Sequence, residues 1–504
     1  MLFTSGEFLL IYLPVVLGGF FVVARWFGRP FAAAWLALAS LFFYGYWRTE
    51  DVPLLVGSIA FNYLAGRHIQ RCTETQARQR RLTLVFAVTV NLLVLAYFKY
   101  ANFLLDSAAA ITGSRPAFVD VVLPIGISFF TFTQIAYLVD SHAGKVRERN
   151  PVHYALFVTY FPHLISGPVL HHAEMMPQFA RAETYTPRLA NAVLGMAFLF
   201  VGLFKKVVVA DSAAPLSNDV FTAAATRALD AATAWQGVLA YTVQIYYDFS
   251  GYSDMAVGLS LLFGVRLPYN FDSPYKARSI IDFWRRWHMT LSRFLRDYLY
   301  VALGGNRRGN LRRYVNLALT MLLGGLWHGA SWTFVVWGGL HGAYLMLNHG
   351  WRHLAASLAG RIPAWRSPLV QSVGHIAALA LTLLAVMVAW VFFRATSVQD
   401  AFHILAAMAG AARPPAAATA APAVATALDP GAWALLLLAM LVALLAPNSQ
   451  QLIDGRLRPS LEAVPASVLR PWQGLAVGAC IVLALLLAMV SASRDVSEFI
   501  YFNF

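Results

Sequence analysis

Long apolar segments recur along the chain and are separated by short polar stretches that are rich in arginine. An α-helix needs roughly 20 apolar residues to cross a bilayer, and most of these segments come close to that length. They are too long and too continuously apolar for the alternating strands of a membrane barrel. The pattern therefore predicts an all-α polytopic membrane protein with about eleven transmembrane helices and additional re-entrant helices. The predicted spans are Phe8–Ala24, Phe31–Tyr46, Val52–Ala65, Leu82–Leu105, Val121–Val139, Leu189–Val209, Trp235–Phe263, Trp332–Leu347, Leu369–Phe393, Trp433–Leu445 and Leu475–Val490.

One further apolar segment, Val152–Pro168, is short and is interrupted by proline and glycine. Broken helices are tolerated at membrane depth only where protein or a cavity covers the free backbone groups, so we expect a re-entrant segment here. It continues into His171, His172 and Glu174, which could be proposed as a metal site. Neighbouring residues on a helix point about 100° apart and share a ligand poorly. An interfacial polar turn is therefore the favoured interpretation, and no metal is expected.

The formal net charge of the chain is +14. In a membrane protein such an excess is typical of cytoplasmic loops, which collect arginine and lysine. The loops 67–81, 145–149 and 456–470 are therefore expected in the cytoplasm, which leaves both termini outside it. This interpretation favours lipid over nucleic acid as the surrounding partner. We expect residues 1–490 to form one transmembrane domain and residues 491–504 to form an extracytoplasmic aromatic tail.

The predicted span Trp235–Phe263 contains acidic and hydroxyl side chains, among them Asp248, Ser250 and Asp254. A carboxylate inside an apolar helix is costly and needs a partner. The arginines of the stretch that follows are the predicted partners. Such pairs could simply lock helices together, or Asp248 and Ser250 could contact a substrate, and the sequence leaves both interpretations open.

The stretch Phe283–Gly329 combines histidines, tryptophans and arginines within apolar surroundings. Taken as a helix from its first residue, it would present Trp284, Trp287, His288 and Ser292 along one face, with its arginines elsewhere on the surface. Guanidinium groups suit phosphates and carboxylates, so a nucleotide-like donor with several phosphates would be drawn to its arginines. A solvated cytoplasmic loop explains the positive charge equally well. The candidate substrate contacts in this stretch are Trp284, Trp287, Trp327, Arg285, Arg293 and Arg296.

A second histidine of this stretch, His328, follows Gly324 and Gly325 and precedes Gly329. Glycine lets other backbone or a ligand approach closely. A buried neutral imidazole can act as a general base, which is worth roughly 10²–10⁴ in rate. It would suit removal of a proton from a hydroxyl that attacks an activated acyl group. A histidine on an apolar face can equally be a satisfied core residue, and the residues alone leave both interpretations open.

Several motifs are spread along nearly the whole chain. Together they identify a family far more specifically than the WHG triplet at positions 327–329 does. The chain resembles the membrane-bound O-acyltransferase (MBOAT) superfamily and, within it, the bacterial branch of the alginate O-acetyltransferase. The D-alanyl transferase for teichoic acids shares the core motifs. The motifs are LPIGISFFTF (123–132), PHLISGPVLHHAEMMPQF (162–179), GLFKKVVVAD (202–211), IYYDFSGYSDMAVGL (245–259), FWRRWHMTLSRFLRDYLYVALGGNRRG (283–309) and GGLWHGASWTFVVWG (324–338).

The resemblance implies that His328 is the catalytic histidine and that His288 holds the superfamily's second signature position. It implies a ring of helices with a waist at the catalytic histidine, a cytoplasmic funnel and an extracytoplasmic funnel. The donor would be acetyl-CoA or an acyl-carrier thioester, used as a substrate, and no cofactor would be tightly bound. In the bacterial inner membrane, a partner acetyltransferase on the extracytoplasmic side would complete transfer to a polysaccharide such as alginate or another exopolysaccharide.

The chain ends in the aromatic sequence FIYFNF, which resembles C-terminal motifs of envelope acylation systems. That resemblance implies a transient acyl carrier at Tyr501. A phenol, with a pKa near 10, is a better leaving group than a sugar alcohol, so an acyl-tyrosine could pass its cargo onward. An aromatic tail resting at the membrane interface is the alternative.

Two other classes of function remain to be weighed. A transporter or flippase could use the histidines as a proton relay without covalent chemistry. An intramembrane metal hydrolase is disfavoured, because the chain lacks the HExxH spacing of such enzymes. Transfer of D-alanyl or another acyl group to a cell-envelope polymer also remains open.

Overall fold

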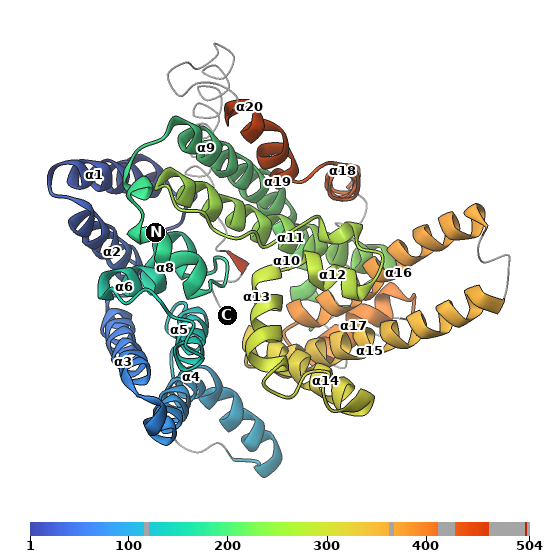
Figure 1. Cartoon of the computed structure of the whole chain (residues 1–504). Coiled ribbons are helices and arrows are strands. Elements are labelled where there is room, and N and C mark those ends of the chain that lie inside the picture. The colour runs from blue at the N-terminus through green and yellow to red at the C-terminus, as the bar shows by residue number, and fades with distance from the viewer. Residues whose placement is uncertain (115–119, 362–366, 412–428, 463–498, 501–504) are drawn as a thin grey trace. The chain divides into compact units, whose positions relative to one another are not determined.

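The computed structural model describes residues 1–114, 120–361, 367–411, 429–462 and 499–500 (Figure 1). Every regular element in these residues is a helix, which confirms the all-α prediction. The helices form two compact units that the chain enters more than once. Unit 1 comprises Met1–Val207, Gly251–Tyr269 and Ser449–Phe504, and unit 2 comprises Val208–Ser250 and Asn270–Asn448.

Unit 1 contains most of the helices of the first half of the chain. Helix α11 (Ala231–Leu262) contributes its first part to unit 2 and its last part to unit 1. The other elements of unit 1 are η1 (Phe8–Tyr12), α1 (Leu13–Trp26), α2 (Arg29–Gly45), η2 (Thr49–Asp51), α3 (Val52–Arg71), η3 (Glu74–Gln76), α4 (Ala77–Thr112), α5 (Ile127–His142), α6 (Pro151–Thr159), α7 (Phe161–Leu164), α8 (His172–Ala180), η4 (Ala182–Tyr185), α9 (Leu189–Leu203), α19 (Ser449–Leu452), η10 (Ile453–Leu457) and α20 (Arg458–Glu462).

An aromatic cluster around Phe161 forms part of the core of unit 1. The Phe161 ring lies 5.4 Å from that of Tyr12, 5.6 Å from that of Phe43 and 5.8 Å from that of Phe263. Tilted and edge-to-face aromatic pairs each contribute about 0.5–1.5 kcal/mol beyond the area that they bury. The cluster therefore ties α7 to η1, α2 and the end of α11.

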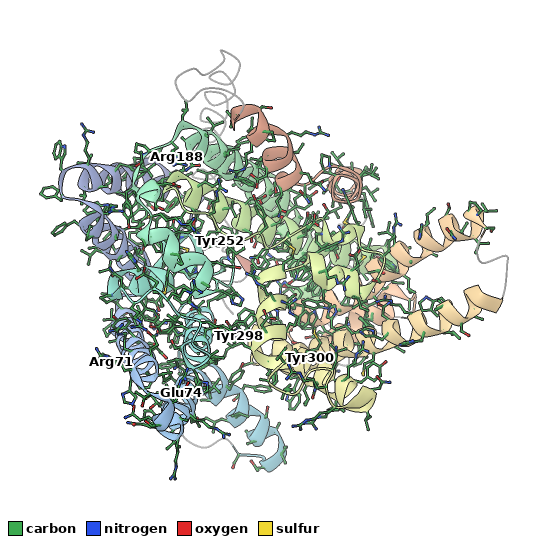
Figure 2. All side chains as sticks on the ribbon, viewed as in Figure 1. Arg71, Glu74, Arg188, Tyr252, Tyr298 and Tyr300 are labelled. Carbon is green, nitrogen blue, oxygen red and sulfur yellow. The ribbon has the colours of Figure 1, made fainter. Side chains whose placement is uncertain are left out.

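The connection between α3 and α4 is shorter than the predicted loop 67–81. Figure 2 labels Arg71, the last residue of α3, and Glu74, the first residue of η3. The backbone N–H of Thr73 donates to Gln76 Oε1 at 3.1 Å, which caps the turn. Hydropathy marks the part of a helix that suits lipid, whereas hydrogen-bonded turns continue into the charged residues on either side. The same reason explains why α3 extends beyond the predicted segment Val52–Ala65.

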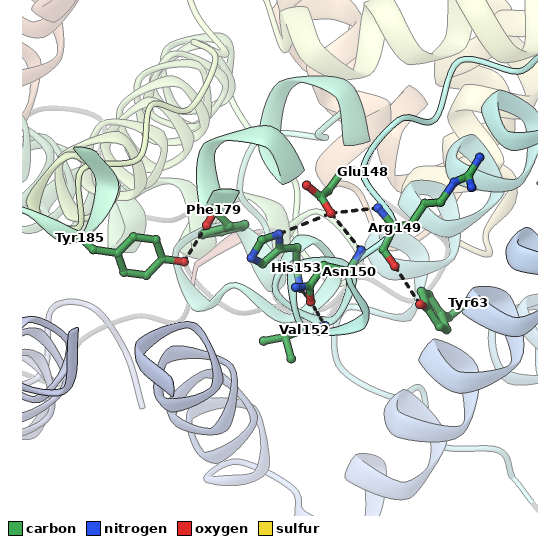
Figure 3. Close-up of polar contacts among 8 residues, drawn as sticks. All are labelled: Tyr63, Glu148, Arg149, Asn150, Val152, His153, Phe179 and Tyr185. Atoms are coloured by element: carbon green, nitrogen blue, oxygen red, sulfur yellow. Dashed lines mark hydrogen bonds and ion pairs between the residues drawn. The ribbon is translucent and has the colours of Figure 1, made fainter. Parts of the chain in front are cut away.

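Helix α6 begins at a set of side-chain caps (Figure 3). Asn150 Oδ1 accepts a hydrogen bond from the backbone N–H of Val152 at 2.8 Å. Glu148 Oε1 accepts from the backbone N–H groups of Arg149 and Asn150, each at 2.9 Å. The Tyr63 hydroxyl donates to the Arg149 carbonyl at 2.8 Å and so ties this turn to α3. These bonds satisfy backbone groups that a helix start leaves without partners.

The break predicted within Val152–Pro168 is confirmed. Helix α6 ends at Thr159, and α7 begins at Phe161 with a proline in its first turn. Proline has no backbone N–H to donate and fixes its own backbone angle, so it suits the start of a new helix. The re-entrant placement of this segment in a bilayer stays a prediction. The predicted span Val121–Val139 is corrected at its start, because α5 begins only at Ile127.

Helices α9 and α11 approach each other through glycines. A Cβ atom at Gly258 would lie 2.5 Å from the Gly195 carbonyl oxygen, and one at Gly202 would lie 2.5 Å from the Gly251 carbonyl oxygen. Small residues allow this close packing, which is typical of helix interfaces in membranes. The pair α9–α11 therefore depends on the absence of side chains at these positions.

Unit 2 is organised around a hairpin of two long helices, α14 and α15, which lie side by side in Figure 1. A Cβ atom at Gly325 would lie 2.3 Å from the Phe334 carbonyl oxygen, and one at Gly338 would lie 2.4 Å from the Met321 carbonyl oxygen. The hairpin turns directly after His328. Besides the first part of α11, unit 2 contains α10 (Asp211–Ala223), η6 (Pro274–Lys276), α12 (Ile280–Arg286), α13 (Met289–Phe294), η7 (Leu295–Tyr300), α14 (Gly309–His328), α15 (Trp332–Arg361), α16 (Pro368–Arg394), α17 (Val398–Met408) and α18 (Pro430–Leu445). Element η5 (Phe204–Ala210) crosses the boundary between the units.

Several helices have the length and composition of membrane spans. Among the described residues, four pass by themselves, and a fifth is added if the helix pair broken after Leu445 counts as one span. These helices support a multi-pass membrane protein, and the total of about eleven spans stays a prediction. The predicted last span, Leu475–Val490, lies outside the described residues. The four helices are Phe8–Trp26, Glu74–Thr112, Leu189–Ala223 and Pro368–Arg394.

We predict that Gly258→Ala destabilises the protein, because the added methyl group would collide with the backbone of α9. Overpacking of this kind typically costs about 1–3 kcal/mol. The matched control is Gly57→Ala in α3, where nothing lies within 4 Å of the added atom. Helix propensity alone would make both changes favourable. The apparent melting temperature of detergent-solubilised protein should fall for the first variant and not for the control; equal values would contradict the interpretation.

Candidate active site

The candidate site residues that the sequence singled out lie in unit 2, with one exception. Tyr501 is outside the described residues, so the structure does not place it. The other ten candidates come from three parts of the unit: α11, the segment from α12 through η7, and the end of α14. They are Asp248, Ser250, Trp284, Arg285, Trp287, His288, Arg293, Arg296, Trp327 and His328.

The prediction of a continuous helix from Phe283 through His288 is wrong. Helix α12 ends at Arg286, Trp287 is extended, and His288 has a left-handed backbone with φ +41°. The backbone N–H of Met289 donates to the Asn270 carbonyl at 2.9 Å, a tertiary hydrogen bond. The tryptophans and His288 therefore do not form one helical stripe. A left-handed conformation costs a residue that has a Cβ roughly 1–2 kcal/mol, so the surroundings must hold His288 in place.

Asn270 holds His288 through its side chain as well. The Asn270 Oδ1 atom lies 3.2 Å from His288 Nδ1 and accepts a hydrogen bond from the Thr290 hydroxyl at 2.6 Å. Because Oδ1 is an acceptor, His288 Nδ1 carries a proton, and Nε2 holds the lone pair when the ring is neutral. The Phe249 ring meets the imidazole edge-on at 4.7 Å. These contacts fix both the tautomer and the direction of the His288 ring.

His328 is the last residue of α14 and is 2% exposed. Aromatic rings surround its imidazole: Trp327 and Trp337 lie 5.0 Å away and Phe393 lies 5.2 Å away, measured between ring centroids. The Trp327 ring also lies 6.4 Å from the ring of His288. The structure therefore brings the two predicted catalytic histidines into one buried aromatic cluster.

Besides the aromatic residues Trp337 and Phe393, sequence reasoning missed two polar residues that contact this cluster. Asn270 gave no signal, because a single asparagine after an apolar run is common in loops. His341 lies in α15, is 0% exposed and accepts a hydrogen bond from Trp284 Nε1 at 3.2 Å. Its signal was present, because it is a lone histidine in an apolar run and is followed by glycine, like His328.

The candidate arginines do not share the burial of the histidines. Arg285 and Arg296 are exposed, and Arg296 Nε donates to Asp297 at 2.7 Å. Arg293 is half-buried. A neighbouring residue that was not a candidate, Arg286, pairs with Asp282 at 2.9 Å. Arg285 and Arg296 therefore differ in exposure from the buried histidines, and their contact with a substrate stays a prediction.

The predicted arginine partner of Asp254 is wrong. Asp254 Oδ2 lies 2.6 Å from Lys205 Nζ, and its Oδ1 accepts a hydrogen bond from the Ser449 hydroxyl at 2.9 Å. All three residues belong to unit 1, and the pair is largely buried. An unpaired charge in apolar surroundings would be costly, so this arrangement supports the interpretation that Asp254 locks helices together. Asp248 and Ser250 are each 2% exposed on the part of α11 that belongs to unit 2.

The histidines near the broken segment do not form a metal-binding group. His172 Nδ1 lies 3.2 Å from Asp140 Oδ2, and Lys145 Nζ lies 3.5 Å from the other oxygen of that carboxylate. In the described ranges of the chain, no three His, Cys, Asp or Glu side chains are placed to hold a metal ion. His172 and Glu174 lie in helix α8 and not in a turn, and the interfacial placement of this segment stays a prediction.

These residues lie in a region that matches a known family. A model of the membrane-bound O-acyltransferase family, MBOAT, matches residues 77–389, which include His288 and His328. Curated relatives cover most of the chain. The chain is 42% identical over 436 residues to the peptidoglycan O-acetyltransferase of Helicobacter pylori, covering 81% of this chain and 80% of the relative. It is 43% identical over 414 residues to the probable alginate O-acetylase AlgI of Azotobacter vinelandii, covering 81% and 78%.

A teichoic acid D-alanyltransferase of Streptococcus thermophilus is more distant, at 26% identity over 244 residues, or 45% of this chain and 57% of the relative. The chain belongs to the MBOAT family, in its branch of bacterial O-acetyltransferases. It is a membrane-bound O-acyltransferase.

We predict that Asn270→Ala lowers acyltransferase activity by up to about 10²-fold, because His288 loses the acceptor that orients its ring, and small displacements at a reacting centre carry losses of that size. Thr290→Val is the matched control, since it removes the other hydrogen bond to the same oxygen and should have a smaller effect. Activity of isolated membranes, normalised to the amount of inserted enzyme, is the measurement. Full activity of Asn270→Ala would show that this bond does not matter.

Proposed function

We propose that this protein takes an acetyl group from a cytoplasmic thioester and passes it across the bacterial inner membrane for O-acetylation of an extracytoplasmic polysaccharide. The thioester is acetyl-CoA or an acylated carrier protein. The observation that carries the proposal is the buried cluster that joins His288, Trp327 and His328. Relatives with names of polysaccharide O-acetylating enzymes support it, with identities of 42% and 43% over about four fifths of the chain.

In the proposed reaction, His328 is the general base. Its imidazole takes the proton of an acceptor hydroxyl while that oxygen attacks the acetyl carbonyl carbon. The carbon–sulfur bond of the thioester then breaks, and the thiolate leaves with the proton that the imidazole had taken. His288 positions the acceptor: with Nδ1 turned to Asn270, its Nε2 lone pair can accept a hydrogen bond from the hydroxyl.

The proposed first acceptor is the phenol of Tyr501. Of the tail, the structure describes residues 499–500, and Phe499 is 2% exposed. Its ring meets that of Tyr252 edge-on at 4.4 Å, and Lys206 Nζ lies 5.0 Å from its centroid. These contacts tie the residue two positions before Tyr501 to unit 1. From an acyl-tyrosine, the acetyl group would pass to a polysaccharide hydroxyl or to a serine of an extracytoplasmic acetyltransferase partner.

The proposed orientation follows from charge. The arginine-rich segment 285–313 would face the cytoplasm and attract the phosphates of the donor. Both termini would lie on the extracytoplasmic side. Arg285 and Arg296 are exposed and can meet such a ligand. In this arrangement the acetyl group crosses the membrane through the enzyme, between the two funnels of a single transmembrane domain. Alginate, another exopolysaccharide and peptidoglycan are the candidate polymers, and D-alanyl transfer is the alternative for the acyl group.

We predict that His328→Ala abolishes acetylation of the polymer, a loss of at least about 10²-fold, because the general base is removed. Ester-linked acetate on the isolated polymer is the measurement, in cells that lack the native gene and carry the variant. Immunoblotting of the membrane fraction controls for insertion. Retained acetylation would end the proposal, and release of D-alanine instead of acetate would reassign the acyl group.

We predict that purified wild-type protein incubated with radiolabelled acetyl-CoA acquires an alkali-labile label, and that Tyr501→Phe does not, because only the phenol oxygen is removed. Phe502→Tyr, a change at the adjacent position, should leave the label unchanged. His328→Ala should also block labelling. Wild-type labelling of Tyr501→Phe would refute the carrier role while leaving the catalytic histidine intact.

A further inference from the structure

A third buried histidine lies in the catalytic cluster and takes no part in the mechanism above. His341 accepts a hydrogen bond at Nδ1 from the indole Nε1–H of Trp284, at 3.2 Å. An indole nitrogen can only donate, so Nδ1 must hold a lone pair, and the proton of the neutral ring sits on Nε2. Trp284 therefore fixes the tautomer of His341, and its ring packs against that of His341 at 5.1 Å.

The Nε2–H group of His341 finds no hydrogen-bond partner in the part of the chain that the structure describes. The same is true, within that part, of the indole N–H of Trp337. The two side chains are 0% and 1% exposed. A buried donor without a partner costs about 1–3 kcal/mol, and native proteins keep few of them. Two such donors in neighbouring side chains are available to a ligand that brings an acceptor.

Trp337 lies next to the predicted general base, and His341 lies next to Trp337. The Trp337 ring meets His341 at 4.8 Å and His328 at 5.0 Å, so it touches both histidines. The neighbouring Phe283 ring stacks on His341 at 6.2 Å and is apolar. In the proposed reaction the substrate atom that needs N–H donors is the acetyl carbonyl oxygen, because it becomes an oxyanion when the acceptor hydroxyl attacks.

Building on the proposed function, we propose that His341 is a further catalytic residue, whose Nε2–H, together with the indole N–H of Trp337, donates hydrogen bonds to the acetyl carbonyl oxygen. The hydroxyl oxygen bonds to the carbonyl carbon, and the hydroxyl proton goes to His328. At the same time the π electron pair of the C=O bond moves onto the carbonyl oxygen. The pair returns when the carbon–sulfur bond breaks, and the thiolate takes the proton from His328. His341 and Trp337 keep their own protons throughout and act as fixed donors.

Two substitutions separate this role from a structural one. His341→Gln can place an amide N–H near the position of Nε2, whereas His341→Asn can place an amide oxygen near the position of Nδ1 and so keeps only the bond from Trp284. A carbonyl-binding role predicts that His341→Asn lowers kcat by about 10²–10³-fold, while His341→Gln stays at least tenfold above it. A structural role predicts the reverse order. The probe is radiolabelled acetyl-CoA with membranes that contain the full chain, and kcat and KM are measured separately.

Trp337→Phe provides a second test, because it removes the other donor and leaves His341 unchanged. It should lower kcat by about 10²-fold with little change in KM, since the bonds strengthen in the transition state. The apparent melting temperature of each variant shows whether it folds. Equal activities of the two His341 variants, the reverse order, or a Trp337→Phe enzyme with wild-type kcat would overturn the proposal.

The control variant His328→Ala keeps the two proposals apart. If it is active, the proposed function fails whatever the result at His341. If it is inactive while His341→Asn and Trp337→Phe turn over like the wild type, only the donor role of His341 and Trp337 is refuted.

Discussion

A polar group that is removed from water must find its partners inside the protein, because neither lipid nor an apolar core supplies any. Two buried polar pairs of unit 1 obey this constraint. Asn62 and Asn91 exchange two amide hydrogen bonds, at 3.0 and 2.7 Å, and join α3 to α4. Asp254 is neutralised by Lys205 in the same way. The N–H groups of His341 and Trp337 are among the buried polar atoms for which no described residue is a partner.

The candidate active site depends on two local departures from regular structure. His288 adopts a left-handed backbone, which the hydrogen bonds to Asn270 hold in place. The hairpin of α14 and α15 packs so closely at Gly325 that a side chain would meet the Phe334 carbonyl. This close approach places the end of α14, and with it His328, against aromatic side chains of α15 and α16. Strain and tight packing thus hold the ring nitrogens in set positions, as acid–base chemistry requires.

The family assignment and the geometry address different parts of the function. The match over residues 77–389 and the O-acetyltransferase relatives establish the class of enzyme. In the proposed mechanism, three histidines of unit 2 divide the work: His328 takes a proton, His288 receives the hydroxyl, and His341 donates to the carbonyl oxygen. A neutral His341 is suited to this task because the bond from Trp284 fixes its proton on the nitrogen that faces away from that indole.

The sequence by itself determined the helical class, the membrane character and the break near Pro162, because hydropathy and motif composition are local properties. It did not determine the end of α12 at Arg286, the lysine partner of Asp254 or the participation of Asn270 and His341. Each of these depends on contacts between residues far apart in the chain. Only the tertiary structure brings Asn270 to His288 and Trp284 to His341, because a hydrogen bond is decided by the position of both partners and local sequence specifies only one.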